Sequence, residues 1–191
     1  SGIAGLPTLA GHLKASGYST GAFVAGFPLD SRFGLGRGFD VYDDNFSQKD
    51  RDPGIDPGRE RRAQAVLDVA LNWLKGRTSP WFLWLHCFDP HDPYVPPEPY
   101  RSRHAQNPYD GEVAYTDAAL GALFRHLEET GLLSATLIVM TGDHGESLGE
   151  HGEKTHGYLA YNASLRIPLI IRLPGEEPRI VTRNVSQLDI Y

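Results

Sequence analysis

The sequence predicts an α/β fold in which helices flank a largely parallel central sheet. Short apolar segments alternate with longer amphipathic segments along the 191 residues, and this alternation is typical of parallel sheets with helical crossovers. Three of the short segments, 80–88, 136–141 and 167–173, are nearly continuous apolar runs. The first run is typical of a central parallel strand that is buried on both faces. The second predicts another buried strand, and the third predicts a further apolar strand.

The first elements are a short helix and a strand. Residues 8–16 are expected to be helical, because a threonine can cap the start of this segment and a glycine follows its end. The β-prone segment 20–25 predicts a buried strand. A glycine loop at 34–38 follows, and the polar stretch 43–58, with its Asp-Pro steps, is expected to be an exposed excursion.

Two longer helices are predicted further along the chain. In 63–74 the apolar residues recur at i, i+3, i+4, i+7, i+8 and i+11, which is one face of a helix with 3.6 residues per turn. The second helix is expected over 109–130, where Gly131 ends it. A proline-rich loop over 89–108 separates the strand at 80–88 from this helix. An edge strand is expected near 179–185.

Composition excludes several classes of function. The formal net charge is −6 and the pI is about 5.7, which argues against binding of a nucleic acid backbone as the main role. A single cysteine excludes an internal disulfide and cysteine-rich zinc modules. No apolar run approaches the roughly 20 residues that a membrane-spanning helix needs.

Ligands of such sheets sit at the carboxyl ends of the strands, and five of the eight histidines lie in or beside the loops after 80–88 and 136–141. In the second loop, Asp143 and His144 directly follow the strand. A carboxylate and an imidazole side by side can supply two ligands to a divalent cation, and nearby glutamates add negative charge. The alternative is a solvated polar loop in which the two residues cap a helix.

The loop after 80–88 contains His91 between prolines that stiffen the backbone. An imidazole held in this way can contact an anionic substrate or protonate a leaving oxygen. The alternative is that Asp89 and His91 only form hydrogen bonds within the loop. His86 lies inside the apolar strand and is interpreted as a core histidine. Cys87 is interpreted as a core residue and not as a nucleophile.

Two segments carry a specific pattern. Residues 88–94 read Phe-Asp-Pro-His-Asp-Pro-Tyr, and residues 141–152 read Thr-Gly-Asp-His-Gly-Glu-Ser-Leu-Gly-Glu-His-Gly. Supporting segments are 8–20, 38–40 and 165–171. Together, in this order, they resemble the sulfatase family of the alkaline phosphatase superfamily from near Leu6 to the end of the chain.

The resemblance implies hydrolysis of sulfate esters, with relatives that cleave phosphate or phosphonate esters. It implies one divalent cation, usually calcium, with manganese, zinc or magnesium as alternatives. Asp143 and His144 match the second pair of metal ligands of the family, and His91 matches a histidine that contacts substrate near the leaving oxygen. A sulfate-contacting lysine of the family corresponds to His156, with Lys154 as the competing assignment.

One departure from the family is large. The Cys/Ser-x-Pro-x-Arg motif, whose Cys or Ser becomes the formylglycine nucleophile, is absent from this chain, and so is the earlier Asp pair of the metal site. In the family both precede the region that resembles residues 1–20. We therefore expect residues 1–191 to be part of a single sulfatase catalytic domain, with the nucleophile region and the C-terminal part outside. Alone, this piece is expected to be inactive and to bind metal weakly.

Three interpretations of the parent protein remain open. The first is a sulfuric ester hydrolase that acts on a small-molecule or glycan sulfate ester, without nucleic acid as partner. The second is a phosphate or phosphonate ester hydrolase or a phosphoglycerol transferase of the same superfamily. The third is a degenerate module without catalysis. By resemblance, a periplasmic or extracellular location is expected.

Overall fold

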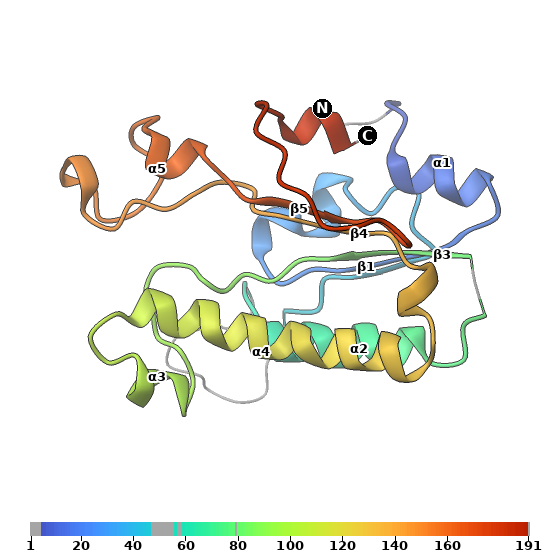
Figure 1. Cartoon of the computed structure of the whole chain (residues 1–191), viewed down its shortest axis with the longest axis horizontal. Coiled ribbons are helices and arrows are strands. Elements are labelled where there is room, and N and C mark those ends of the chain that lie inside the picture. The colour runs from blue at the N-terminus through green and yellow to red at the C-terminus, as the bar shows by residue number, and fades with distance from the viewer. Residues whose placement is uncertain (1–4, 47–55, 57–58, 79, 191) are drawn as a thin grey trace. The chain divides into compact units, whose positions relative to one another are not determined.

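Two units make up the chain, one formed by residues up to His126 and the other by Leu127–Ile190. A computed structural model describes residues 5–46, 56, 59–78 and 80–190 (Figure 1). Each unit is described by itself below.

The first unit is built on a sheet of three strands, and its strands are parallel, as the sequence predicts. In spatial order the strands are β2 (Val41–Asp43), β1 (Ser19–Phe23) and β3 (Trp81–Leu85). Their carboxyl ends lie at one edge of the sheet because all three run in the same direction. The loop that follows β3 therefore starts at the edge where parallel sheets commonly bind ligands.

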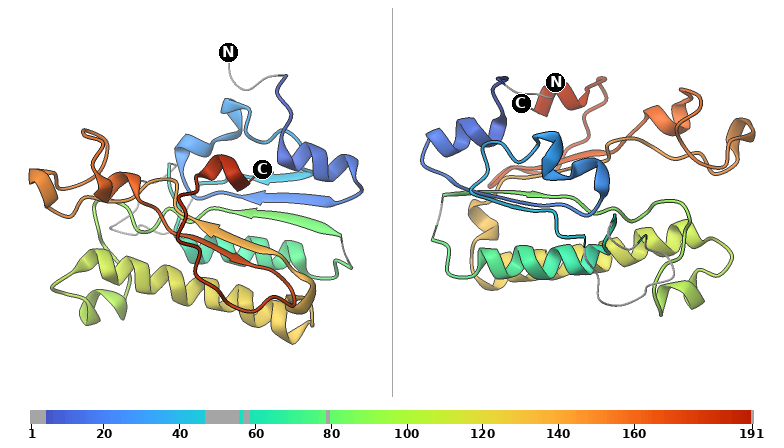
Figure 2. Two further views of the ribbon diagram at one scale, coloured as in Figure 1. Left: turned by 45° about the horizontal axis from the view of Figure 1, so that its top comes forward. Right: turned by 180° about the vertical axis from the view of Figure 1, so that it is seen from behind.

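Helices cover both faces of this sheet. The helices of the first unit are α1 (Leu9–Ala15), α2 (Ala63–Leu74), α3 (Tyr100–Arg103) and α4 (Pro108–Glu129), whose last residues extend into the second unit. Figures 1 and 2 show α1 on one face of the sheet and α2 and α4 on the other. The predicted N-cap of α1 is confirmed, since Thr8 Oγ1 accepts the N–H of Gly11 at 3.0 Å.

The core of the first unit lies between α2 and the sheet. Its fully buried members are Phe23, Ala25, Val66 and Ala70. The last two belong to the apolar face of α2 that the sequence predicts, and burial of each large apolar side chain contributes about 1.5–3 kcal/mol. On the opposite face of β3, aromatic rings pack together, and the Phe39 ring stacks on Phe82 at a centroid distance of 5.8 Å.

One expectation for this sheet is wrong, and one of its strands was not predicted. The apolar segment 80–88 was expected to form a strand buried on both faces, but the described sheet has β1 at its centre, and every residue of β3 is only half-buried. Among the described strands, β3 pairs with β1 along a single edge, which leaves its side chains partly open. Strand β2 was not predicted, because three residues are too few to show an alternating pattern.

The polar stretch 43–58 is described only in part, since residues 47–55 and 57–58 lie outside the described residues. Its described beginning is not an exposed excursion. Asp43 closes β2 and Phe46 is buried. Burial of the Phe46 ring removes apolar surface from water, and this gain outweighs the preference of the neighbouring polar residues for solvent.

The second unit contains an antiparallel pair of strands, β4 (Ile138–Thr141) and β5 (Leu169–Arg172), and the one-turn helix α5 (Asn162–Leu165). The strand positions match the prediction. The antiparallel pairing departs from the largely parallel sheet that was expected, and β4 is not the buried strand that was expected. Three of the four residues in each strand are exposed. The reason is that few side chains of the second unit pack against this two-stranded sheet.

The edge strand expected at 179–185 is wrong. These residues form no strand, and Ile180 is 92% exposed. A β-prone sequence needs a neighbouring strand to satisfy its backbone, and none of the described strands pairs with this segment. Among the described helices, none is both long and apolar enough to cross a membrane.

Candidate functional site

The candidate residues belong to two loops, one in each unit. The β3 loop, residues 86–97, follows β3 in the first unit. The β4 loop, residues 142–157, follows β4 in the second unit. Both loops leave the carboxyl end of a strand, as the sequence predicts, and each is described separately.

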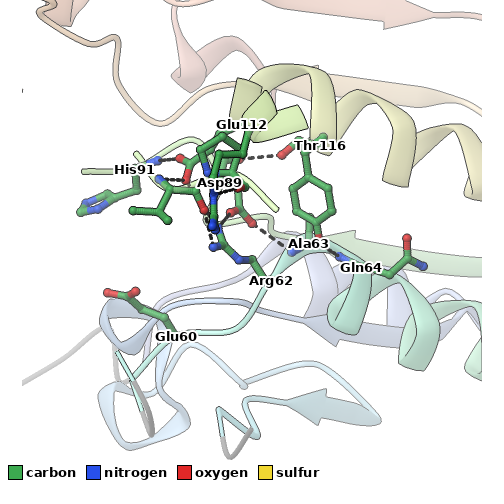
Figure 3. A network of polar contacts seen from close by, with 12 residues as sticks. Glu60, Arg62, Ala63, Gln64, Asp89, His91, Glu112 and Thr116 are labelled. Carbon is green, nitrogen blue, oxygen red and sulfur yellow. Dashed lines mark hydrogen bonds and ion pairs between the residues drawn. The ribbon is translucent and has the colours of Figure 1, made fainter. Parts of the chain in front are cut away.

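A buried polar network anchors the β3 loop (Figure 3). The Arg62 guanidinium, just before α2, lies 2.6 Å from Asp89 Oδ1 and 3.4 Å from Glu112 Oε1. Arg62 Nη2 also donates to the carbonyl oxygen of Val95 at 2.6 Å. The second Asp89 oxygen accepts the N–H of Ala63 at 3.0 Å and so caps the first turn of α2. The interpretation that Asp89 bonds only within its own loop is therefore wrong.

Glu112 of α4 fixes the backbone of the β3 loop. Its Oε2 accepts the N–H of His91 at 3.0 Å, and its Oε1 accepts the N–H of Val95 at 2.8 Å. Burial raises the pKa of the Glu112 carboxyl, although the N–H donors and Arg62 act in the opposite direction. Because both oxygens accept N–H groups, this geometry suits the ionised form.

His91 presents its side chain on the other side of this anchor. Figure 3 shows the imidazole pointing away from Arg62 and Glu112. The ring stacks on Phe88 with centroids 4.2 Å apart, and Nδ1 lies 2.7 Å from the carbonyl oxygen of Asp92. A carbonyl oxygen only accepts, so Nδ1 carries a proton in this contact. Nε2 is then the nitrogen whose protonation can change.

His86 and Cys87, near the end of β3, are half-buried and do not lie in the fully buried core that was expected for them. The N–H of Ala25 donates to His86 Nδ1 at 3.4 Å, which links this histidine to the neighbouring backbone. Burial raises the pKa of the Cys87 thiol to about 12, and the charge of Asp89 adds to this effect. Cys87 therefore remains a neutral thiol near pH 7, which does not suit a nucleophile.

The proposed metal ligands Asp143 and His144 lie side by side in the β4 loop. Asp143 Oδ2 is 3.8 Å from His144 Nε2, a separation that allows both atoms to bind one cation at ordinary ligand distances. His144 Nδ1 lies 2.8 Å from the carbonyl oxygen of Gly145. This contact places the proton on Nδ1 and makes Nε2 the nitrogen that can bind a metal, as is usual for histidine ligands.

These two residues fit part of a metal site. Nowhere in the described ranges do three or more His, Cys, Asp or Glu side chains form a group that could hold an ion. Calcium takes six to eight oxygen ligands and zinc takes four ligands. Further ligands are therefore needed, and the metal remains a prediction.

The β4 loop also brings His156 to the same place. Its ring lies against the His144 ring, with centroids 3.9 Å apart. His156 Nδ1 is 3.1 Å and 3.2 Å from the two carboxylate oxygens of Glu146, whose side chain is 7% exposed. The carboxylate thereby orients the imidazole. The competing candidate, Lys154, is exposed in the same loop.

Sequence reasoning missed Arg62 and Glu112, and it took Glu146 only as negative charge in the loop and not as the partner of His156. A signal for one of them was present. Glu112 begins the buried stripe of α4 that continues through Tyr115 and Ala119, and a carboxylate on an apolar stripe requires a partner. The partners themselves come from distant segments, which a single sequence does not reveal.

The family of this chain follows from a match over nearly its whole length. The family model described as Sulfatase matches residues 2–191. The chain belongs to the sulfatase family. Its α/β sheet and flanking helices agree with this family and with the fold class that the sequence predicts.

Two curated relatives of this sulfatase-family chain are named as different kinds of protein. The multifunctional alkaline phosphatase superfamily protein PehA of Trinickia caryophylli is 31% identical over 56% of this chain and 31% of its own length. Iduronate 2-sulfatase of Homo sapiens is 36% identical over 44% of this chain and 15% of its own length.

Among solved structures, the phosphonate monoester hydrolase of Agrobacterium radiobacter superposes with a TM-score of 0.68. The match covers 90% of this chain and 53% of that chain, at 19% identity, and shows a shared fold. The sulfatase-family chain thus spans about half of this solved relative, and its alignments cover 31% and 15% of the two curated relatives.

Proposed function

We propose that this chain is part of the catalytic domain of a metal-dependent sulfuric ester hydrolase. The observation that carries the proposal is the cluster in the β4 loop, where Asp143, His144 and His156 gather at the carboxyl end of β4. The membership in the sulfatase family and the similarity to a named sulfatase support the reaction class. The substrate class would be a small-molecule or glycan sulfate ester.

In this proposal Asp143 and the Nε2 atom of His144 hold one divalent cation together with ligands from outside these residues. When bound, such a cation polarises the ester and stabilises negative charge on its oxygens. Calcium is the first choice by resemblance. A histidine nitrogen among the ligands also suits manganese or zinc, and magnesium is a further alternative.

The remaining candidate residues handle charge and protons. His156, held by Glu146, is the group that would contact the transferring sulfate and offset its negative charge. His91 would donate a proton from Nε2 to the oxygen of the departing alcohol. The nucleophile is expected to be a formylglycine outside this chain, so no step of attack is assigned to Cys87.

A phosphate or phosphonate ester hydrolase is the second candidate. The observation in its favour is the 31% identity to a protein named as multifunctional within the alkaline phosphatase superfamily. Sulfate and phosphate esters share a tetrahedral group with anionic oxygens, so a cation and a protonated imidazole can serve both.

The deciding experiment uses the full-length protein encoded by the natural gene. Its kcat/KM is measured on 4-nitrophenyl sulfate, 4-nitrophenyl phosphate and a 4-nitrophenyl phosphonate, after treatment with a chelator and after return of each metal in turn. A sulfatase prefers the sulfate ester, loses activity with the chelator and yields an aldehyde-bearing peptide by mass spectrometry. Preference for the phosphorus esters with an unmodified nucleophile supports the second candidate. Absence of turnover on all three esters contradicts both.

A further inference from the structure

We propose that Glu112 is a positioning residue that holds His91 in the orientation needed for proton transfer to the leaving group. The inference rests on the proposed function of His91. It concerns a residue of α4 that lies in no recognisable motif and is 1% exposed.

The first step of the argument is the geometry of the anchor. One carboxylate accepts two backbone N–H groups of the β3 loop, that of His91 at 3.0 Å and that of Val95 at 2.8 Å. These two residues are four positions apart, so Glu112 fixes both ends of the short segment 91–95. The Nδ1 contact of His91 with the Asp92 carbonyl, at 2.7 Å, lies within that same segment. Fixing the backbone therefore also fixes the imidazole.

The second step is the role of Arg62. Its guanidinium lies between two buried carboxylates, 2.6 Å from Asp89 and 3.4 Å from Glu112. It also donates to the carbonyl oxygen of Val95. Burial of charged groups is costly, and such networks contribute little net stability compared with apolar packing. What this network does supply is a single arrangement of the loop, because each charged group is bonded in several directions.

The third step connects the anchor to the chemistry. Proton transfer requires the donor nitrogen within hydrogen-bond reach of the leaving oxygen, and a misplacement of about 1 Å can cost about 100-fold in rate. The prolines of the β3 loop restrict its backbone angles but donate no hydrogen bond that could hold it against α4. Glu112 provides this attachment.

The test uses a double-mutant cycle in the full-length enzyme. Glu112→Gln keeps the size of the side chain but places an NH₂ group against one of the two N–H donors. We expect kcat on an alkyl sulfate to fall about 10–100-fold, with KM changed less than about threefold. In a His91→Ala background the same substitution is expected to change kcat by less than about threefold, because the group it positions is already gone.

Two comparisons separate positioning from general destabilisation. The loss in Glu112→Gln is expected to be smaller on 4-nitrophenyl sulfate, whose phenolate leaves without a proton. Tyr115→Phe is the matched control, since the Tyr115 hydroxyl accepts the N–H of Gln64 in the same region of the core at 3.0 Å. It is expected to lower the melting temperature without changing the preference between the two esters.

Amide hydrogen exchange gives a readout that does not depend on activity. We expect exchange at His91 and Val95 to become at least about tenfold faster in Glu112→Gln and to stay unchanged in Tyr115→Phe. Unchanged exchange at both amides, or equal losses of kcat with and without His91, would overturn the proposal. Faster exchange in a protein that hydrolyses no sulfate or phosphorus ester would support the anchor and refute the proposed function.

Discussion

At the scale of single residues, each candidate histidine has its Nδ1 atom in contact with an oxygen atom. Nδ1 of His144 faces a carbonyl oxygen, and Nδ1 of His156 faces the Glu146 carboxylate. Such contacts select the tautomer and the orientation of the ring. In the proposed function, this orientation leaves Nε2 of His144 as the atom that would bind a cation beside Asp143, and His156 as the side chain that would contact the sulfate.

If Asp143 is a metal ligand, its removal should lower both the bound metal and the activity. Asp143→Ala in the full-length enzyme is expected to lower both bound metal and kcat/KM by at least about 100-fold, because loss of a direct ligand exceeds the usual effect of an outer partner. The control is Glu177→Gln, which removes an exposed carboxylate of the same unit. Unchanged metal content by elemental analysis in the Asp143 variant would show that the assignment is wrong.

The competition between His156 and Lys154 can be resolved by the same assay. His156→Gln is expected to lower kcat/KM on a sulfate ester about 100-fold, because it removes the imidazole that is proposed to contact the sulfate beside the Asp-His pair. Lys154→Gln is expected to change it less than about threefold, as for an exposed charge in a high-dielectric environment. The reverse order of effects would assign the sulfate contact to Lys154.

At the scale of elements, helix α2 is capped by side chains from outside the helix. Asp89 of the β3 loop accepts the N–H of Ala63, and Tyr115 of α4 accepts the N–H of Gln64. The beginning of α2 therefore depends on two segments that are distant in sequence. This dependence links the stability of the helix to the conformation of the β3 loop.

Removal of the Asp89 carboxylate is expected to be costly for stability. Asp89→Ala leaves Arg62 buried with one partner fewer, and we expect the free energy of unfolding to fall by about 3–5 kcal/mol. Tyr115→Phe removes one hydrogen bond and is expected to cost about 1 kcal/mol. Urea denaturation of both variants measures the difference. Equal and small losses would indicate that the Arg62–Asp89 pair is exposed to water in solution.

The turn after the Asp-His pair depends on the small size of Gly145. A Cβ atom at this position would overlap the carbonyl oxygen of Ala163 in α5. The Gly145 N–H also donates to the carbonyl oxygen of Ser164 at 2.8 Å. Gly145→Ala is expected to separate α5 from the β4 loop and cost about 1–3 kcal/mol, with metal content reduced. A fully stable variant with normal metal content would contradict this packing.

At the scale of the whole molecule, local sequence patterns predicted the positions of helices and strands well. They did not predict the contacts between segments that are distant in sequence. The helix 63–74 and the strand near 138–141 were found from periodicity and apolar runs, because these signals lie within one segment. The burial of β4 and the strand at 179–185 were predicted wrongly, because burial and pairing depend on neighbouring strands. Likewise His156 was found by resemblance, whereas its partner Glu146 needed the folded loop.

The stability of the first unit at acid pH depends on Asp40, which connects α1 to the sheet. The Lys14 ammonium at 2.7 Å, together with the N–H of Thr20, lowers the pKa of Asp40 to about 2. The same group titrates at about 3.9 in an unfolded chain. The lowered value means that the unfolded state binds the proton first, so the contribution of Asp40 is complete above about pH 4 and disappears toward pH 2.

Glu112 acts in the opposite direction, since its raised pKa lets the folded state bind a proton first and favours folding as the pH falls. From the lowered pKa of Asp40 we expect the urea midpoint of the wild type to decrease as the pH is lowered from 5 to 2. Asp40→Asn is expected to make this decrease smaller. The Asp40 side chain is 42% exposed, so salt should weaken the effect. A wild type and an Asp40→Asn variant with parallel pH profiles would show that the Lys14 contact does not persist in solution.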